Sequence, residues 1–276
     1  MKIAVCQTNS GTDPVENATA LVSMVKTSAD AGAAIVFTPE MSGLLDRDRI
    51  RAAGNIESEA DDKVLKALKN AASEHRIWIA LGSLALAKER EDGRLVNRSF
   101  VIDDSGTVRA RYDKLHLFDV DLATGESWRE SAHYAPGDGA VVVNTPVATL
   151  GLSVCYDLRF PALYSALSEA GAQLLTVPAA FTVPTGEAHW QILLRARAIE
   201  NAAYVVAAAQ SGLHQDGRST FGHSLVVDPW GKVLLDMGER QGVGFAEIDI
   251  DVVQKVRRQI PVLEHRCSIP HVVHIL

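Results

Sequence analysis

Cys155 has the surroundings of a catalytic nucleophile. The apolar run from Val147 to Val154 predicts a buried strand, and Pro161 then opens a helical pattern, because proline fits the first turn of a helix. A cysteine at this junction would lie near backbone N–H groups and the positive end of the helix dipole, which favour the thiolate. The sequence therefore predicts a nucleophilic thiol, with a buried structural cysteine as the alternative.

Two further residues could complete such a site. Glu40 comes directly after a strand that Pro39 ends, and α/β folds place ligand sites at the carboxyl ends of strands. Lys114 follows a predicted hairpin, within an amphipathic stretch. Taken singly, a loop carboxylate and a surface lysine are the ordinary interpretations of these two residues. A thiol nucleophile also needs a base, for which His116 and His223 are the alternative candidates.

Strand and helix patterns alternate along the chain, which predicts an α/β fold. A weak internal repeat divides the chain into two halves, so that Glu40 belongs to one half and Cys155 to the other. Two such halves, related by a pseudo-twofold axis, would bury their sheets face to face. We therefore expect a single domain over residues 1–276 with a four-layer αββα sandwich. The matched segments are strands 32–39 and 171–178, helices 59–75 and 187–201, strands 77–81 and 203–207, and hairpins 101–108 and 226–233.

The composition is that of an ordinary globular protein. The 276 residues are 47% hydrophobic and 22% charged, and the net charge of -7 argues against nucleic acid or an anionic membrane as a partner. The cysteines Cys6, Cys155 and Cys267 are odd in number and widely spaced, which favours a reducing cytoplasm, and we expect Cys6 to be an inert core residue. No signal peptide is expected at the N-terminus. His271 and His274 lie close enough to share a metal, but a tail position favours a role other than metal ligation.

Three motifs, in this order along the chain, resemble those of the nitrilase superfamily of carbon–nitrogen hydrolases. They are Pro39-Glu40 at a strand end, YDKLHLF at 112–118 and VCYDLRFP at 154–161. The resemblance continues through RARAIEN at 195–201 and GHSLVVDPWG at 222–231, and the stretch 194–212 is similar to the Nit branch. It covers essentially the whole chain and implies the αββα sandwich that the internal repeat predicts independently.

The resemblance implies a Glu-Lys-Cys triad. Glu40 would take the thiol proton and later activate water, and burial near another carboxylate would raise its pKa. Lys114 and the backbone N–H after Cys155 would hold the tetrahedral oxyanion, while Glu130 would orient Lys114 or the attacking water. Attack of Cys155 on an amide would give a thioester that water hydrolyses, with no metal and no organic cofactor.

The resemblance also implies a small amide substrate with an anionic 2-oxo acid end. Arg159 could bind the carboxylate of this substrate, or could instead form a structural ion pair with Asp157. The loop 178–186 would line the acyl pocket. The predicted substrate-binding residues are Tyr156, Arg159, Phe181 and Thr185.

A homodimer or higher homo-oligomer is the family expectation. The helix at 187–197 would form the interface, and Trp190 on that helix suits either the interface or the core. Related amides, N-carbamoyl compounds and nitriles are alternative substrates, and a non-catalytic scaffold is the alternative class of protein. A scaffold would usually have lost at least one catalytic residue, whereas Glu40, Lys114, Glu130 and Cys155 are all present.

Overall fold

The computed structural model describes residues 1–87, 92–121, 125, 127–268 and 273–275. Two six-stranded sheets form its centre, and each is parallel in the middle and antiparallel toward both edges. The first sheet has the order β16-β1-β2-β3-β4-β5. Its strands are β16 (Gly242–Glu247), β1 (Lys2–Gln7), β2 (Ile35–Phe37), β3 (Trp78–Leu86), β4 (Val96–Ile102) and β5 (Val108–Asp113).

The second sheet repeats this arrangement. Its order, read from the matching edge, is β8-β9-β10-β11-β14-β15, so strands β9, β10 and β11 correspond to β1, β2 and β3. The internal repeat predicted from the sequence is therefore confirmed. The strands are β8 (Val142–Asn144), β9 (Thr149–Leu152), β10 (Leu174–Thr176), β11 (Tyr204–Ala207), β14 (Leu225–Val227) and β15 (Val233–Asp236).

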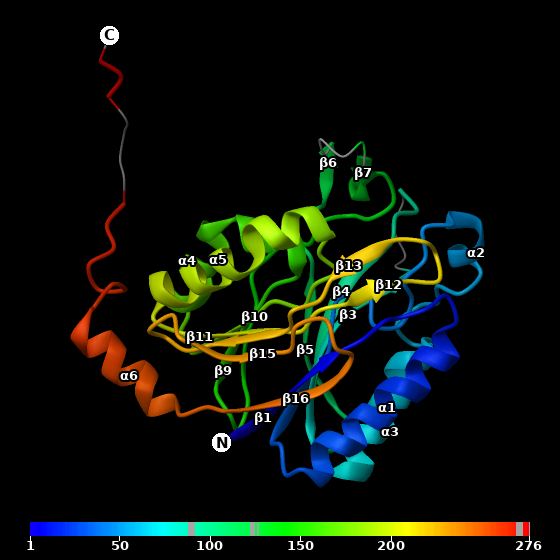
Figure 1. Ribbon diagram of the computed structural model, residues 1–276, viewed down its shortest axis with the longest axis horizontal. Helices are drawn as coiled ribbons and strands as arrows, with labels where there is room; N and C mark the ends of the chain where they lie inside the picture. Colours follow the sequence, from blue (N-terminus) through cyan, green and yellow to red (C-terminus); the bar gives the residue numbers. More distant parts are fainter. Residues whose placement is uncertain (88–91, 122–124, 126, 269–272, 276) are drawn as a thin grey trace.

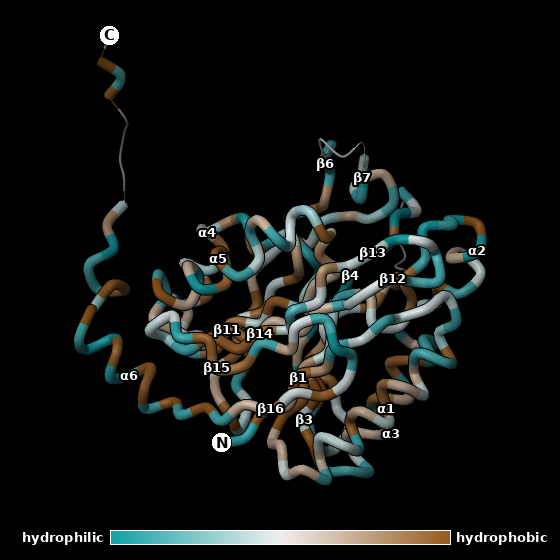
Figure 2. Tube along the Cα trace, viewed as in Figure 1, coloured by the Kyte–Doolittle hydropathy of each residue, from teal (hydrophilic) through white to brown (hydrophobic). Residues whose placement is uncertain are grey.

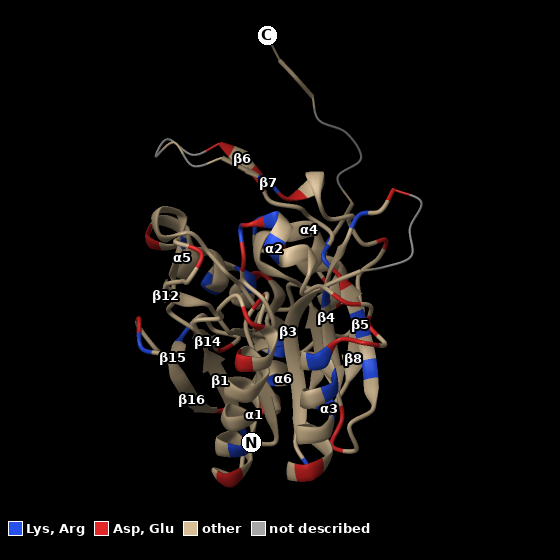
Figure 3. Cartoon of the chain, turned by 90° about the vertical axis from the view of Figure 1, so that its right-hand side faces the viewer, with Lys and Arg blue, Asp and Glu red and all other residues tan. Residues whose placement is uncertain are grey.

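Helices cover the outer faces of the two sheets. Helices α1 (Pro14–Asp30) and α3 (Lys63–His75) lie together on the first sheet, and α4 (Pro161–Glu169) and α5 (Val183–Asn201) lie on the second (Figure 1). Figure 3 marks the charged residues of α1 and α3, and all of them are exposed. The four-layer αββα sandwich is thus the observed fold. The remaining elements are α2 (Arg49–Ala53), β6 (Asp119–Asp121), β7 (Ser127–Arg129), β12 (Ser211–Leu213), β13 (Ser219–Phe221) and α6 (Ile250–Gln259).

The alternation of side chains along β1 shows how the layers are packed. Ile3 and Val5 join the apolar core between the two sheets, whereas Ala4 and Cys6 join the separate core beneath α1 and α3. Both faces of this strand are therefore apolar. The central strands are accordingly coloured as hydrophobic in Figure 2. Burial raises the pKa of Cys6 to about 12, so this thiol is an inert core residue, as expected.

Two helix boundaries differ from the sequence prediction. Helix α3 begins at Lys63 rather than near 59, because the Asp62 side chain accepts the Leu65 backbone N–H and caps the helix. Helix α5 begins earlier than predicted, at Val183, with Pro184 in its first turn. Thr185 therefore lies on a helix and not in a loop.

No helix within the described ranges combines the length and the apolar composition needed to cross a membrane. The cytoplasmic location stays a prediction from the cysteine content.

Candidate active site

The predicted triad residues all follow the ends of strands. Glu40 lies three residues after β2, Lys114 directly after β5, and Cys155 three residues after β9. Strands β2 and β5 belong to the first sheet and β9 to the second, so the three side chains meet where the two halves join. Glu130 comes from outside both sheets, in the turn that follows β7.

The Lys114 ammonium group bridges two carboxylates. Its Nζ donates to Glu40 Oε1 at 2.9 Å and to Glu130 Oε2 and Oε1 at 2.9 and 3.1 Å. The three side chains are 2%, 6% and 12% exposed, respectively. Charge-assisted hydrogen bonds of this length, shielded from water, fix the ammonium group in one position.

Asn97 on β4 connects the same two carboxylates. Its Nδ2 donates to Glu40 Oε1 at 3.0 Å and to Glu130 Oε1 at 3.2 Å. Since ionised carboxylates only accept hydrogen bonds, the amide nitrogen must face them. Its Oδ1 is then buried without a partner in the described part of the chain, which costs about 1–3 kcal/mol. We infer that the two hydrogen bonds to the carboxylates stabilise the site by more than the unpaired amide oxygen destabilises it.

Cys155 lies against the other side of Glu40. The thiol is hydrogen-bonded to the Glu40 carboxylate, and Glu40 Oε2 also accepts the Ala180 backbone N–H at 3.0 Å. Both Glu40 oxygens therefore accept hydrogen bonds, and these bonds hold the carboxylate next to the sulfur.

Burial and charge set the protonation states in a way that the sequence did not predict. Burial raises the pKa of Cys155 well above its usual range, and the Glu40 carboxylate adds to this effect. The predicted stabilisation of a thiolate by the helix dipole is thus wrong for the resting protein, which holds a neutral thiol. Burial also pushes the pKa of Glu40 upward, but Lys114 and the hydrogen bonds of Cys155 and Asn97 outweigh it, so this pKa is lowered and not raised as predicted. Burial opposes the charge on Lys114, but Glu130 and Glu40 raise its pKa well above 10.5.

The nucleophile sits on a strained turn. Cys155 has φ +49°, in the left-handed region, at the start of the 3₁₀ turn Cys155–Arg159 that precedes α4. This conformation costs a non-glycine residue on the order of 1–3 kcal/mol. The Cys155 backbone N–H donates to Pro178 O at 2.8 Å, which anchors the turn to the end of β10. Such strain is typical of a sharp strand-to-helix turn that displays a nucleophile.

A buried carboxylate fixes this turn to the loop that carries Lys114. Asp157 is fully buried, and its Oδ2 accepts from Tyr112 Oη at 2.7 Å and from the Val154 backbone N–H at 2.8 Å. Its Oδ1 accepts from the His116 backbone N–H at 3.0 Å and lies 2.7 Å from His116 Nδ1. No ion pair with Arg159 forms, because all four contacts of Asp157 go elsewhere.

The four residues open into a cavity with an empty volume of about 920 Å³, which includes its mouth. Three of the predicted substrate-binding residues, Tyr156, Phe181 and Thr185, line this cavity. Arg159 does not line it. Its guanidinium lies over the rings of Tyr156 and Phe181, at 5.9 and 5.6 Å from their centroids, and therefore supports two cavity walls.

Neither candidate histidine reaches the cavity. The His116 ring stacks on Phe160 at 3.6 Å and contacts Asp157, and His223 Nδ1 lies 2.9 Å from Asp236 Oδ1. The part of the chain that the structure describes contains no cluster of three metal-ligating side chains, and His271 lies outside it. Trp190 belongs to the core: it is 1% exposed, and its Nε1 donates to His223 O at 2.8 Å.

The sequence reasoning missed several residues of this site. Asn97 is one: it is the first of three consecutive polar residues, Asn97 to Ser99, in the strand 96–102, so residue type alone does not distinguish it from its neighbours. Arg49, Tyr134 and Arg218 also line the cavity, but they come from segments far apart in the chain. No local pattern marks these three positions.

Comparison with known proteins identifies the class. The model of the carbon–nitrogen hydrolase family matches residues 2–258. The chain therefore belongs to this family, the nitrilase superfamily, and is a hydrolase that acts on a carbon–nitrogen amide bond.

Relatives place the chain in the Nit branch. The deaminated glutathione amidase of Yersinia enterocolitica is 39% identical over 264 residues, which are 95% of this chain and 92% of that protein. The NitFhit fusion protein of Caenorhabditis elegans is 41% identical over 277 residues, which are 99% of this chain but 62% of the fusion, so the chain spans less than two thirds of it. Its crystal structure superposes with a TM-score of 0.88, covering 96% of this chain and 64% of that one. Nit3 of Saccharomyces cerevisiae, described as a member of branch 10 of the superfamily, gives a TM-score of 0.84 at 26% identity, covering 95% and 94% of the two chains.

Proposed function

We propose that the protein is a cysteine-dependent amidase in which Glu40, Lys114 and Cys155 perform the chemistry and Glu130 positions Lys114. The observation that carries this proposal is the buried Lys114 ammonium group, shared between two carboxylates, one of which contacts the Cys155 thiol. A lysine held in this way can stabilise negative charge at an adjacent carbonyl oxygen without titrating near neutral pH.

The mechanism begins with the neutral thiol. Glu40 takes the thiol proton as Sγ bonds to the amide carbon, and the carbonyl oxygen becomes an oxyanion held by Lys114 and the backbone N–H of Tyr156. The C–N bond then breaks, and protonated Glu40 returns the proton to the leaving nitrogen. A thioester on Cys155 remains.

Hydrolysis of this thioester uses the same groups. Glu40 takes a proton from water, which attacks the thioester carbon, and Lys114 again holds the oxyanion. Collapse breaks the C–S bond, releases the acid and returns the proton to sulfur. Glu130 and Asn97 act as positioning residues, because they hold Lys114 and Glu40 and not the reacting carbon.

The substrate we propose is deaminated glutathione, hydrolysed to 2-oxoglutarate and Cys-Gly. The support is that relatives at 38–39% identity over most of the chain are named deaminated glutathione amidase. The alternative is an omega-amidase that takes 2-oxoglutaramate, which shares the acyl group and differs in the leaving amine.

A single assay separates these alternatives. Release of 2-oxoglutarate is measured from deaminated glutathione and from 2-oxoglutaramate, with Cys155→Ala as the control. A higher kcat/KM for the peptide substrate supports the proposal, and a preference for 2-oxoglutaramate assigns the chain to omega-amidase. Unchanged turnover by Cys155→Ala would rule out the cysteine mechanism for either substrate.

We also propose that α5 contributes to a homodimer interface. Ile192 and Ile199, two turns apart on one face, are 70% and 50% exposed, and the adjacent Trp230 is 58% exposed. Ile199 lies against the turn at Gly231, which directly follows Trp230, so we infer that the exposed side chains of α5 and this turn belong to one interface. Analytical ultracentrifugation of the wild type and of Ile192→Asp tests this proposal: a monomeric wild type contradicts it, and dissociation of the variant supports it.

A further inference from the structure

A second group of charged residues lines the cavity that contains Cys155. Arg49 comes from the first turn of α2, and Arg218 from the turn that joins β12 and β13. The hydrolysis mechanism has no role for either guanidinium. The β12–β13 hairpin reaches toward the segment that leads into α2 (Figure 1).

Arg218 is held in a fixed position. Its Nε donates to Asp216 Oδ2 at 2.6 Å, and the Asp216 side chain is fully buried. The same carboxylate accepts the backbone N–H groups of Arg218 and Arg47 at 3.0 and 2.9 Å. The Arg218 guanidinium also lies 5.2 Å from the centroid of the Trp128 ring. Because its Nε is hydrogen-bonded and its plane lies over an indole ring, the Arg218 guanidinium has little freedom to turn away from the cavity.

The Nη groups of Arg218 are left without acceptors. Among the donors of Arg218, only Nε and the backbone N–H have acceptors in the described ranges, although the side chain is just 17% exposed. The indole N–H of Trp128, which lines the same wall, is also buried and unpaired there. Polar donors in a partly buried wall normally find acceptors, so these donors indicate an acceptor that arrives with the ligand.

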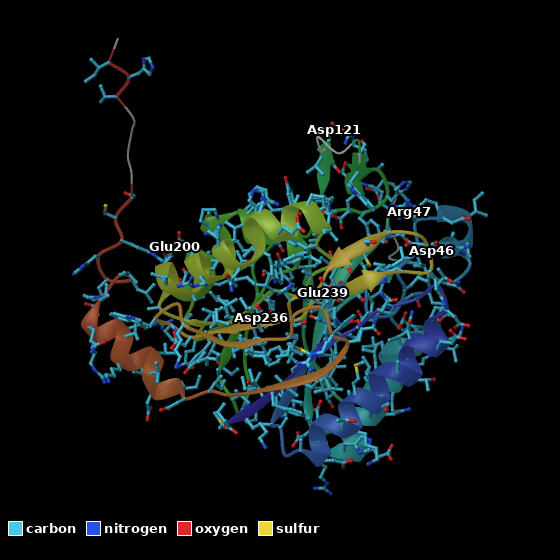
Figure 4. All side chains as sticks on the ribbon, in the orientation of Figure 1. Asp46, Arg47, Asp121, Glu200, Asp236 and Glu239 are labelled. Carbon is cyan, nitrogen blue, oxygen red and sulfur yellow. The ribbon has the colours of Figure 1, made fainter. Side chains whose placement is uncertain are left out.

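The nearby carboxylates of Asp46 and Asp121 already form ion pairs with other arginines. Asp46 receives two hydrogen bonds from Arg51, at 2.6 and 2.8 Å, and Asp121 receives two from Arg129, at 2.9 and 2.7 Å. Asp46 lies beside Arg47 and α2, and Asp121 lies on the projecting β6–β7 hairpin (Figure 4). Arg49 itself forms no ion pair with a described carboxylate, and its guanidinium lies 6.0 Å from the centroid of the Tyr134 ring.

We propose that Arg218, together with Arg49, forms a carboxylate-binding subsite for the substrate. The two Nη groups of a clamped guanidinium match the two oxygens of a carboxylate. This inference rests on the proposed function, because the subsite shares its cavity with Cys155. Deaminated glutathione offers a carboxylate at each end, one on the acyl group and one on the leaving Cys-Gly, and the chemistry of recognition is the same for both.

The test compares Arg218→Gln with Arg47→Gln. Arg47 is a matched control, because its guanidinium also lies over Trp128, at 5.9 Å, but does not line the cavity. The value of kcat/KM is measured for deaminated glutathione, for its glycinamide derivative, for 2-oxoglutaramate and for the neutral amide butyramide. Thermal unfolding of each variant checks the fold, and Arg218→Lys retains the charge without the planar fork.

We expect Arg218→Gln to lower kcat/KM for deaminated glutathione by roughly tenfold or more, mainly through KM, because it removes a charge-assisted contact. If kcat/KM falls only for deaminated glutathione, the subsite binds the glycine carboxylate. If kcat/KM falls equally for all three anionic substrates, the subsite binds the carboxylate of the acyl group. Arg218→Lys should retain part of the affinity, and Arg47→Gln should resemble the wild type. An equal loss with butyramide, or no loss with any substrate, overturns the proposal.

A binding measurement keeps this test separate from that of the proposed function. The product 2-oxoglutarate is titrated by calorimetry into Cys155→Ala and into Cys155→Ala/Arg218→Gln. Weaker binding to the double variant supports the subsite even if neither peptide nor 2-oxoglutaramate is hydrolysed, an outcome that would refute the proposed substrate alone. Equal binding to both variants, with unchanged kinetics, refutes the subsite.

Discussion

Asp157 and His116 share a 2.7 Å contact between the carboxylate Oδ1 and the ring Nδ1. Asp157 lies two residues after Cys155, and His116 lies two residues after Lys114. One buried carboxylate therefore fixes the distance between the nucleophile of the second half and the oxyanion-binding cation of the first.

Asp157→Asn should destabilise the protein out of proportion to its small change in volume. Both oxygens of Asp157 accept from donors, so the amide nitrogen of asparagine would face N–H or O–H groups in either orientation. We expect a loss of about 2 kcal/mol in the free energy of unfolding, measured by urea denaturation. Tyr112→Phe removes a single donor and should cost less. An Asp157→Asn protein as stable as the wild type would contradict this role.

The value of kcat/KM should stay high down to an unusually low pH. Glu40 must be ionised to act as base, and its pKa is lowered below 4.5, so activity should fall only below that pH. The lowered pKa also stabilises the fold above 4.5, and this contribution is lost as the pH falls through the folded-state pKa. The pKa of Lys114, well above 10.5, predicts no alkaline loss through this group near neutrality. An acid limb near 6.5 would instead indicate a histidine base.

Alkylation of Cys155 should depend on Glu40. Because the thiol is neutral at rest, its reaction with iodoacetamide requires Glu40 to accept the proton. Glu40→Gln should therefore slow alkylation at neutral pH by at least tenfold and reduce turnover by a larger factor. The rate is followed by mass spectrometry of the intact protein, with exposed Cys267 as an internal control. Equal rates for Cys155 in the two proteins would show that another group activates the thiol.

Asn97→Leu should shift the acid limb of the profile upward. The Asn97 hydrogen bond is one of the interactions that lower the pKa of Glu40, so its loss should raise that pKa. We also expect kcat to fall more than KM changes, because Asn97 positions catalytic groups. Ser99→Ala is the matched control, since Ser99 lies on the same strand and its Oγ bonds to Leu81 O. A fall in stability with an unshifted profile would reduce Asn97 to a structural role.

Much of the fold and the centre of the candidate site could be predicted from the sequence. The repeat of glycine, apolar strand and proline at 32–39 and 171–178 is a local pattern, and it places Glu40 at the end of β2 because proline cannot continue the strand. The apolar run 147–154 likewise predicts a strand that ends just before Cys155.

Properties that arise between distant segments could not be predicted. The pKa of Glu40 depends on an ammonium group 74 residues away, and the sequence does not show that Lys114 reaches it. The anchoring of Arg218 depends on Trp128, which lies in another hairpin. Arg159 is the converse case: it is close to Cys155 in sequence, yet the turn directs its guanidinium onto aromatic rings and not into the cavity.

The pairing of β1 with β16 has a consequence for biosynthesis. Strand β1 pairs along its whole length with residues 242–247, and Gln210 Nε2 donates to the backbone oxygen of Glu40 at 3.0 Å. Strand β1 is therefore synthesised long before its partner β16, and until β16 is made one edge of β1 stays unpaired and exposed to other chains. The first half, which contains Glu40 and Lys114, is synthesised early. Its sheet is complete only after residue 247 has left the ribosome.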